Sequence, residues 1–456
     1  MTSTSTPRRK GSGIGGFTDG KVGAHLLRLG SFMAVGSITM NVAQLAEAVY
    51  LGIVGTEALA AMGFAFPITI TLFAFAGGIG SGASSVIARA AGAGDRDLVA
   101  RLVTHAQLLA ILVGVVVGSI GGLLAEQIVT GLGAKDLVRA MTIDYLRVYM
   151  VGVPFFILSI VGSTLLRATG HAASPGIVMA AGSLMQIACG PVLIFGWFGL
   201  PELGIAGAAW AYVISRIFSV MLYGVLLVRA RMVHWSLQGL WSSWISILHV
   251  GGPAIASGLI QPVSMLIITR LLAGHGHEVV AGYNVASRVE TMAHMILWSA
   301  SSSLEPFVGQ NWGARLYDRA KRALRLTNGF CLIWGVVTFG LMWLFGREIA
   351  MLIDDNPIVV EVSVWFFWII PLSIGFMGMM QVSSSCFNAL GRPGPALVIA
   401  VVRTLVFYIP LTIAGNYLWG YVGIFIATAF SNVVVGVAAW WWNTSWVHRS
   451  AAELTR

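Results

Sequence analysis

The sequence predicts an all-α polytopic membrane protein with twelve transmembrane helices, arranged as two six-helix bundles related by a parallel internal repeat. Three observations predict it: a low charge content, long uncharged apolar segments, and motifs that recur at a constant offset. Of 456 residues, 57% are hydrophobic and only 10% are charged, whereas a soluble domain carries about 25% charged residues. This composition leaves little surface suited to water and excludes a soluble enzyme.

The apolar segments have the length of membrane-spanning helices. Residues 102–125 contain no Asp, Glu, Lys or Arg, and as a helix they would rise about 36 Å, more than the roughly 30 Å of a hydrocarbon core. A barrel would instead alternate apolar and polar residues in segments of about ten. We expect twelve spans, near 29–54, 58–88, 102–125, 144–166, 175–199, 204–228, 249–273, 279–307, 326–346, 361–388, 396–418 and 421–446.

The basic residues predict the orientation. With the N-terminus inside, the inner segments hold nineteen Lys and Arg and the outer segments five, and cytoplasmic loops are enriched in these residues. We therefore expect both termini in the cytoplasm, at a bacterial-type inner membrane. The net charge of +9 comes from these loops and does not indicate nucleic acid. Residues 1–24 and 447–456 are expected to be cytoplasmic tails, the first disordered. No cleavable signal peptide is expected.

Glycine-containing motifs repeat along the chain. Each of three glycines in the first half recurs 221 residues later, pairing Gly30 with Gly251, Gly92 with Gly313, and Gly170 with Gly391. Halves with an even number of spans enter the membrane in the same orientation, as parallel repeats do. We expect one bundle over 25–228, an interfacial linker over 229–248 and a second bundle over 249–446. Such pairs enclose a central cavity whose two openings alternate.

Glu47 lies within the first predicted span. An ionisable residue inside a span is a candidate functional residue. Burial favours the neutral form of a carboxyl group, so such an acid can exchange a coupling proton, and a carboxylate can also bind Na⁺. Gln44 and Met40 share its helix face, so we expect Gln44 at the ion-coupling site and Met40 in the substrate cavity. The alternative is a structural Glu47, hydrogen-bonded within the bundle.

The eighth predicted span carries a polar stripe. At about 100° per residue, one narrow sector contains Tyr283, Ser287, Glu290, His294, Trp298, Ser301 and Glu305. Such a stripe is costly against lipid, so we expect its members from Tyr283 to Trp298 to line the substrate cavity. Glu290 and His294 are four residues apart and close enough to share a proton. A polar packing seam between helices is the alternative.

Further cavity candidates lie in the seventh and tenth spans. Gln261 precedes Pro262, and prolines in a span free backbone carbonyls as ligands. Met379 and Gln381 belong to a methionine-rich stretch. Flexible thioethers suit promiscuous apolar binding, although core packing is the other reading of a methionine run. No cofactor or metal site is expected.

Several motifs resemble those of the MATE (multidrug and toxic compound extrusion) family. The most specific is residues 306–314, Pro-Phe-Val-Gly-Gln-Asn-Trp-Gly-Ala, followed by Asp318-Arg319; its counterpart in the first half is residues 87–93. Residues 166–170 and 387–393 are similar to the family's two helix-end motifs. The resemblance covers about residues 25–446. It implies two six-helix bundles and the export of drugs, often cationic, driven by Na⁺ or H⁺.

The resemblance also implies a role for Glu47. Members usually carry an acidic residue in the first span with a glycine five residues later, as Glu47 and Gly52 do here. Relatives similar to the NorM branch often have Glu in span seven and Asp in span ten. Here span seven has Gln261, and span ten has no carboxylate beyond Glu361. These departures favour a DinF-like member coupled to H⁺ over one coupled to Na⁺.

The sequence thus predicts a secondary active multidrug antiporter, a monomer that exports small organic cations in exchange for H⁺ or Na⁺. One alternative is a lipid-linked precursor flippase of the same superfamily, which would favour a strongly basic cavity where this chain has Glu47 and Glu290. Another is an integral membrane enzyme, which would need a polar catalytic cluster at one interface.

Overall fold

The computed structural model describes residues 16–455, which contain helices and no strands. The N-terminal lobe consists of α1 (Val22–Val54), α2 (Thr56–Ala93), α3 (Arg96–Leu123), α4 (Ala125–Gly131), α5 (Asp136–Ala168), α6 (Ser174–Ile194), the short 3₁₀ turn η1 (Trp197–Gly199) and α7 (Gly204–Arg229). The C-terminal lobe consists of α8 (Leu240–Ala273), α9 (His277–Gly313), α10 (Tyr317–Ile353), α11 (Pro357–Ile369), η2 (Ile370–Ser373), α12 (Ile374–Ala389), α13 (Pro393–Val401), the π-helical η3 (Val402–Tyr408) and α14 (Ile409–Thr455).

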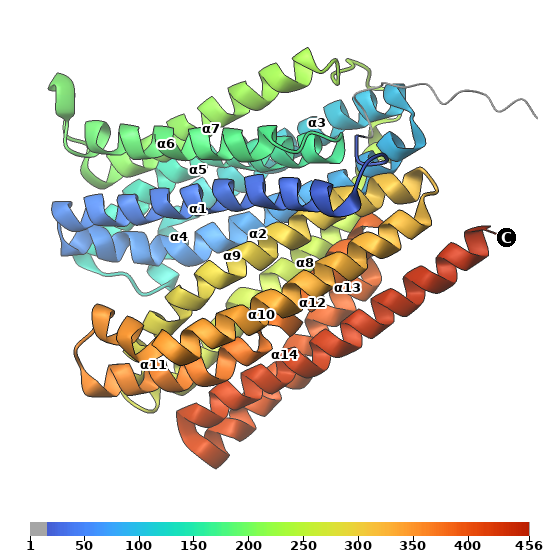
Figure 1. The fold of residues 1–456 in the computed structure, drawn as a ribbon. Coiled ribbons are helices and arrows are strands. Elements are labelled where there is room, and N and C mark those ends of the chain that lie inside the picture. Colours follow the sequence, from blue (N-terminus) through green and yellow to red (C-terminus); the bar gives the residue numbers. More distant parts are fainter. Residues whose placement is uncertain (1–15, 456) are drawn as a thin grey trace, which may run out of the picture.

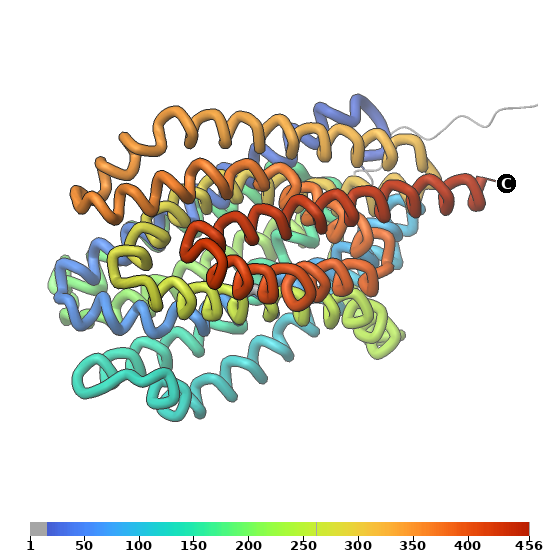
Figure 2. Tube along the Cα trace, turned by 90° about the horizontal axis from the view of Figure 1, so that it is seen from below, coloured from blue at the N-terminus to red at the C-terminus, as the bar shows by residue number. Residues whose placement is uncertain are grey.

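The described chain crosses the membrane twelve times. Ten stretches are long and apolar enough to do so. One of them, Pro393–Thr455, turns back on itself where Trp419 and Gly420 leave helical geometry, so it supplies two crossings (Figure 2). The twelfth is α9, which has 37 residues but carries the polar stripe. The predicted span count is confirmed, and the chain is a multi-pass membrane protein.

Local sequence signals set several helix ends. Asp95 caps α3 by accepting a hydrogen bond of 2.9 Å from the Leu98 amide, and Asn356 caps α11 in the same way at 3.0 Å from Ile358. Both satisfy amides that have no partner within the helix. Gly94 follows α2 at a φ of 84°, in the left-handed region that favours glycine. α3 and α11 therefore begin, and α2 ends, at residues that the local sequence marks.

The two lobes diverge from one end of the molecule to the other (Figure 1). They meet at the end that also holds Phe17, residues 305–313 and the last turns of α14, which we call the closed end. There Arg89 Nη1 donates 2.8 Å to the Ala389 carbonyl, and Gln310 Nε2 donates 2.8 Å to the Ala168 carbonyl. Donors and acceptors are both related by the 221-residue offset. These matched contacts confirm the parallel repeat.

Glycines permit the close approach of α2 and α9 at this end. A Cβ atom on Gly92 would lie 1.9 Å from the Gln310 carbonyl oxygen, and one on Gly313 would lie 2.1 Å from that of Arg89. Neither position can hold a larger residue without separating the two backbones. The repeated glycines of the sequence therefore serve the contact between the lobes.

Three predicted boundaries differ from the structure. The N-terminal tail was expected to reach residue 24, but α1 begins at Val22 and Phe17 is buried, with its amide donating 3.1 Å to Gln310 Oε1. Residues 1–15 lie outside the described residues. The linker is shorter than expected because α8 begins at Leu240, and α14 continues helically to Thr455.

Candidate functional sites in the two lobes

Glu47 is enclosed within the N-terminal lobe. Its side chain comes from α1 and is only 9% exposed. One carboxylate oxygen accepts 2.9 Å from the Tyr145 hydroxyl of α5, and the other accepts 2.9 Å from Gln186 Nε2 of α6. Glu47 and Gln186 also border a cavity of about 10 Å³, which is room for about one water molecule. Glu47 therefore lies in a small, closed polar site.

A second layer supports these partners. Arg216 of α7 donates 3.3 Å to Gln186 Oε1 and lies 4.9 Å from the centroid of the Tyr212 ring. Tyr212 in turn stacks on Tyr149 with centroids 4.3 Å apart. Gln186 thus links a buried carboxylate to a buried guanidinium, and each charge has a compensating group nearby.

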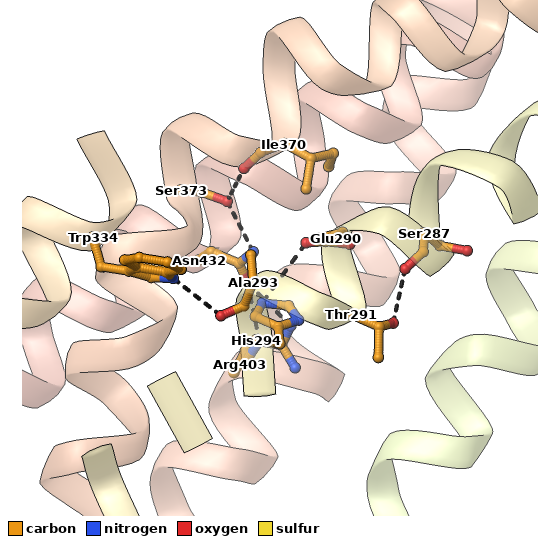
Figure 3. A network of polar contacts seen from close by, with 10 residues as sticks. All are labelled: Ser287, Glu290, Thr291, Ala293, His294, Trp334, Ile370, Ser373, Arg403 and Asn432. Carbon is orange, nitrogen blue, oxygen red and sulfur yellow. Dashed lines mark hydrogen bonds and ion pairs between the residues drawn. The ribbon is translucent and has the colours of Figure 1, made fainter. Parts of the chain in front are cut away.

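The C-terminal lobe contains a larger polar cavity of about 90 Å³. Glu290 and His294 of α9 face each other there, with Oε1 and Nε2 3.7 Å apart. Arg403, from the π-helical segment η3, donates to Asn432 Oδ1 at 3.0 and 3.1 Å. Figure 3 shows these four side chains gathered together, with Ser287 and Thr291 lying apart from them.

The side chains around this cavity are fixed by hydrogen bonds from α14 to η2. Asn432 Nδ2 donates 3.1 Å to Ser373 Oγ, which donates 2.8 Å to the Ile370 carbonyl. Asn432 thereby has its oxygen directed to Arg403 and its nitrogen to Ser373, which fixes the orientation of the amide. The arrangement can hold a proton or a bound water between Glu290 and His294, beside a fixed positive charge.

The structure divides the stripe predicted on the eighth span. Tyr283, Glu290 and His294 line the cavity inside the C-terminal lobe. Trp298 is 48% exposed and turned away from it, and Ser287 donates to the Asn284 carbonyl of its own helix at 3.2 Å. The stripe therefore does not face one common cavity, because the helices around α9 cover Glu290 and His294 but leave Trp298 exposed.

The other predicted residues are scattered. Gln44 is exposed and Met40 half-buried, so Gln44 is outside the site that encloses Glu47. In α12, Met379 is buried, and Gln381 Oε1 is buried without a hydrogen-bond partner among the described residues. Gln261 lies in α8, and its side chain is outside the described part of the chain.

A family comparison decides the class of this two-lobed chain. The MatE family model matches residues 33–192 and 253–414, one segment in each lobe. The chain belongs to the MatE family. Its fold and its family make it a membrane transporter and not an enzyme, and the resemblance found in the sequence motifs is confirmed.

Relatives of this MatE chain are similar over most of their length. The FAD transporter of Shewanella oneidensis is 30% identical over 430 residues, covering 93% of this chain and 95% of that protein. The probable multidrug resistance protein NorM of Thermotoga maritima is 24% identical over 387 residues, covering 83% of each. The Vibrio cholerae MATE transporter VcmN in its bent form is 26% identical, with a TM-score of 0.89, and the match covers 94% of this chain and 98% of that one.

Several residues of the two polar sites were not predicted from the sequence. Tyr145 and Gln186 around Glu47, and Asn432 beside Glu290, are polar residues of kinds that are common in helices. Arg216 and Arg403 did carry a signal, since each is a charged residue inside a span. Attention to those two arginines would have pointed to both clusters.

Proposed function

We propose that this MatE transporter is a secondary active antiporter that exports small organic solutes in exchange for H⁺. The observation that carries the proposal is the enclosure of Glu47, a carboxyl group inside a spanning bundle with a hydrogen-bond partner on each oxygen. An acid at membrane depth is costly in free energy, so its presence there indicates a role in the transport cycle. Exchange of one proton changes its charge without changing its packing.

The partners of Glu47 favour H⁺ over Na⁺ as the coupling ion. Tyr145 and Gln186 direct an O–H and an N–H toward the carboxylate oxygens, which are the atoms a hard cation would need as ligands. The Tyr145 hydroxyl oxygen can also accept a hydrogen bond from the protonated acid, while Gln186 Oε1 accepts from Arg216. The same shell therefore serves both protonation states.

Alternating access follows from the lobe arrangement. The contacts between lobes described above, Arg89 with Ala389 and Gln310 with Ala168, all belong to the closed end. With the positive-inside orientation, the termini and this closed end lie in the cytoplasm. The transporter is then closed to the cytoplasm and open to the outside, and rocking of one lobe against the other exchanges the two openings.

The names of relatives guide the choice of solute. One relative is called an FAD transporter, and others are called multidrug resistance or export proteins. We propose a small organic substrate that contains a planar ring system, carried by a single copy of the chain.

Transport in proteoliposomes tests this function. Purified protein would be reconstituted, and movement of ethidium, riboflavin and flavin mononucleotide would be followed by fluorescence under a pH gradient or a Na⁺ gradient. We expect a pH gradient to drive at least one probe with the internal Na⁺ concentration held constant. Transport that responds to Na⁺ alone would contradict H⁺ coupling, and no transport of any probe would contradict the proposed function.

A further inference from the structure

One face of α9 meets the N-terminal lobe at the closed end. Glu305 Oε1 accepts 2.9 Å from Ser81 of α2, and Gly313 lies against the Arg89 backbone of the same helix. Ser303 lies against Gly30 of α1. Measured from Glu305 at 100° per residue, Gly313 lies at about 80° and Ser303 at about 160°. This sector of α9 therefore faces α2 and α1.

The same sector continues toward the open end and reaches Arg288. On the same scale Arg288 lies at about 100°, between the directions of α2 and α1. Arg288 is exposed, as are Asn284 and Thr291 one turn to either side. Exposed side chains that point toward the other lobe indicate a space between the lobes at this level, which we call the interlobe cleft. Arg288 stands eleven residues after His277, about 16 Å from the start of α9 and so at membrane depth.

The facing sectors of the neighbouring helices carry no charge toward the cleft. On α1 the sector that begins at Gly30 continues to Asn41 and Gln44. On α2 it continues from Ala74, which lies against Gly258 of α8, to Thr71 and Pro67. On α8 it continues to Pro262 and Thr269, whereas Arg270 lies about 80° outside it. Among the described residues, Arg288 is the one exposed charged side chain in these four sectors, because Glu305 and Arg89 are half-buried in contacts at the closed end.

No acid compensates Arg288 within the described chain. The ion pairs of residues 16–455 join Arg139 to Glu126, His294 to Glu290, and Lys321 to Asp318. Glu290 is two residues away but points about 160° from Arg288, into the cavity of the C-terminal lobe. An unpaired guanidinium at membrane depth is stabilised when an anionic group of a bound solute pairs with it.

An aromatic surface lies deeper on the same face. Trp298 is 48% exposed and Met292 is 68% exposed. Trp298 is ten residues beyond Arg288, about 15 Å toward the closed end. The indole ring offers a flat surface for stacking, and Met292, which lies about 40° round the helix from Arg288, can adapt to the shape of a ring system.

We infer that the interlobe cleft binds organic anions, with Arg288 holding a phosphate or carboxylate group and Trp298 stacking on a planar ring of the same solute. The inference rests on the proposed function and names its substrate class. It replaces the cationic solute expected from the sequence, because the two acids behind that expectation, Glu47 and Glu290, point into the lobes and not into the cleft.

Charge-matched probes in proteoliposomes test the inference. Flavin mononucleotide carries a phosphate, carboxyfluorescein carries carboxylates, riboflavin is neutral and ethidium is cationic. With Arg288→Gln we expect transport of the two anions to fall at least tenfold, while transport of ethidium stays within twofold. Arg288→Lys should retain part of the anion transport, because the charge remains but the planar fork is lost. Arg270→Gln is the matched control and should change neither anion transport nor ethidium transport.

The outcomes separate the inference from the function on which it rests. Equal losses of anion and cation transport in Arg288→Gln, at normal yield and thermal stability, would assign Arg288 to packing and overturn the inference. Unchanged anion transport would overturn it as well, while pH-driven export still stood. A fall for flavin mononucleotide alone would identify phosphate as the recognised group, and a fall for carboxyfluorescein alone would identify carboxylate. Trp298→Leu should weaken binding of riboflavin and flavin mononucleotide alike, as measured by flavin fluorescence.

Discussion

Glu47 of α1 and Ile268 of α8 occupy equivalent positions in the two lobes, 221 residues apart, and each borders the cavity of its own lobe. Tyr145 and Phe366 are related by the same offset. The hydrogen-bonded acid and phenol of the N-terminal lobe are thus replaced by an apolar pair in the C-terminal lobe. There the carboxyl group comes from Glu290, on the next helix. The lobes share a fold but place their acids differently.

The first prediction concerns coupling through Glu47. Glu47→Gln keeps the size of the side chain and one of its two acceptor oxygens but cannot release a proton, so we expect pH-driven export to fall at least tenfold with normal solute binding. Glu47→Asp should keep partial activity, because its carboxylate is retracted by one methylene from Tyr145 and Gln186. A pH-sensitive dye inside proteoliposomes measures solute-induced proton movement. Export by Glu47→Gln at the wild-type rate would make Glu47 structural.

The second prediction concerns the charges of the C-terminal cavity. Glu290→Gln removes a negative charge from the cavity that it shares with the half-buried Arg403, so we expect a lower melting temperature. Arg403→Gln should also destabilise, and the double variant should lose less than the sum of the single ones. Groups in one charge network couple by about 0.5–3 kcal/mol, and thermal unfolding in detergent measures this. Strict additivity would show that the two residues do not interact.

The third prediction concerns the glycine contact at the closed end. Gly92→Ala would place a methyl group against the Gln310 carbonyl, so we expect the closed end to open and export to fall. Gly77→Ala is the matched control on the same helix, since nothing lies within 4 Å of its Cβ position. A cysteine placed at Ser85, after replacement of the three native cysteines, should react faster with a thiol reagent in Gly92→Ala. Equal rates in both variants would argue against the contact as a gate.

The fourth prediction concerns orientation. Phe198, which is 89% exposed at the open end, and Leu454, which is exposed at the closed end, can each be replaced by cysteine. In intact cells a membrane-impermeant reagent should label Phe198→Cys and spare Leu454→Cys, with both labelled after lysis. The reverse pattern would place the termini outside and invert the proposed direction of opening.

The membrane crossings and the repeat could be predicted because each depends on a pattern within a short stretch of sequence. A span needs only a long apolar stretch, and Gly92 and Gly313 mark equivalent helix ends by sequence alone. The ends of the tails could not be predicted in this way. The Phe17 amide donates a hydrogen bond to Gln310, which is 293 residues away. The sequence around Phe17 does not predict such a contact.

The candidate sites were predicted only in part for a related reason. Helical periodicity indicates which residues share a face, so Glu290 and His294 were paired correctly. It does not say which helix covers that face. The partners of Glu47 are 98 and 139 residues away, and Gln44, one turn from Glu47, belongs to the neighbouring sector. Packing of whole helices, and not the sequence of one, decides whether an acid faces its lobe or the cleft.

The paired hydrogen bonds at the closed end bear on the origin of the chain. Arg89 reaches Ala389, while Gln310, its counterpart, reaches Ala168, the counterpart of Ala389. Reciprocity of this kind is what an isologous homodimer produces about a two-fold axis. A half-length ancestor with a single donor at this position would have formed both bonds by pairing with an identical copy. Within a single chain the two donor positions need not be identical, and here one holds arginine and the other glutamine, while both glycine positions hold glycine.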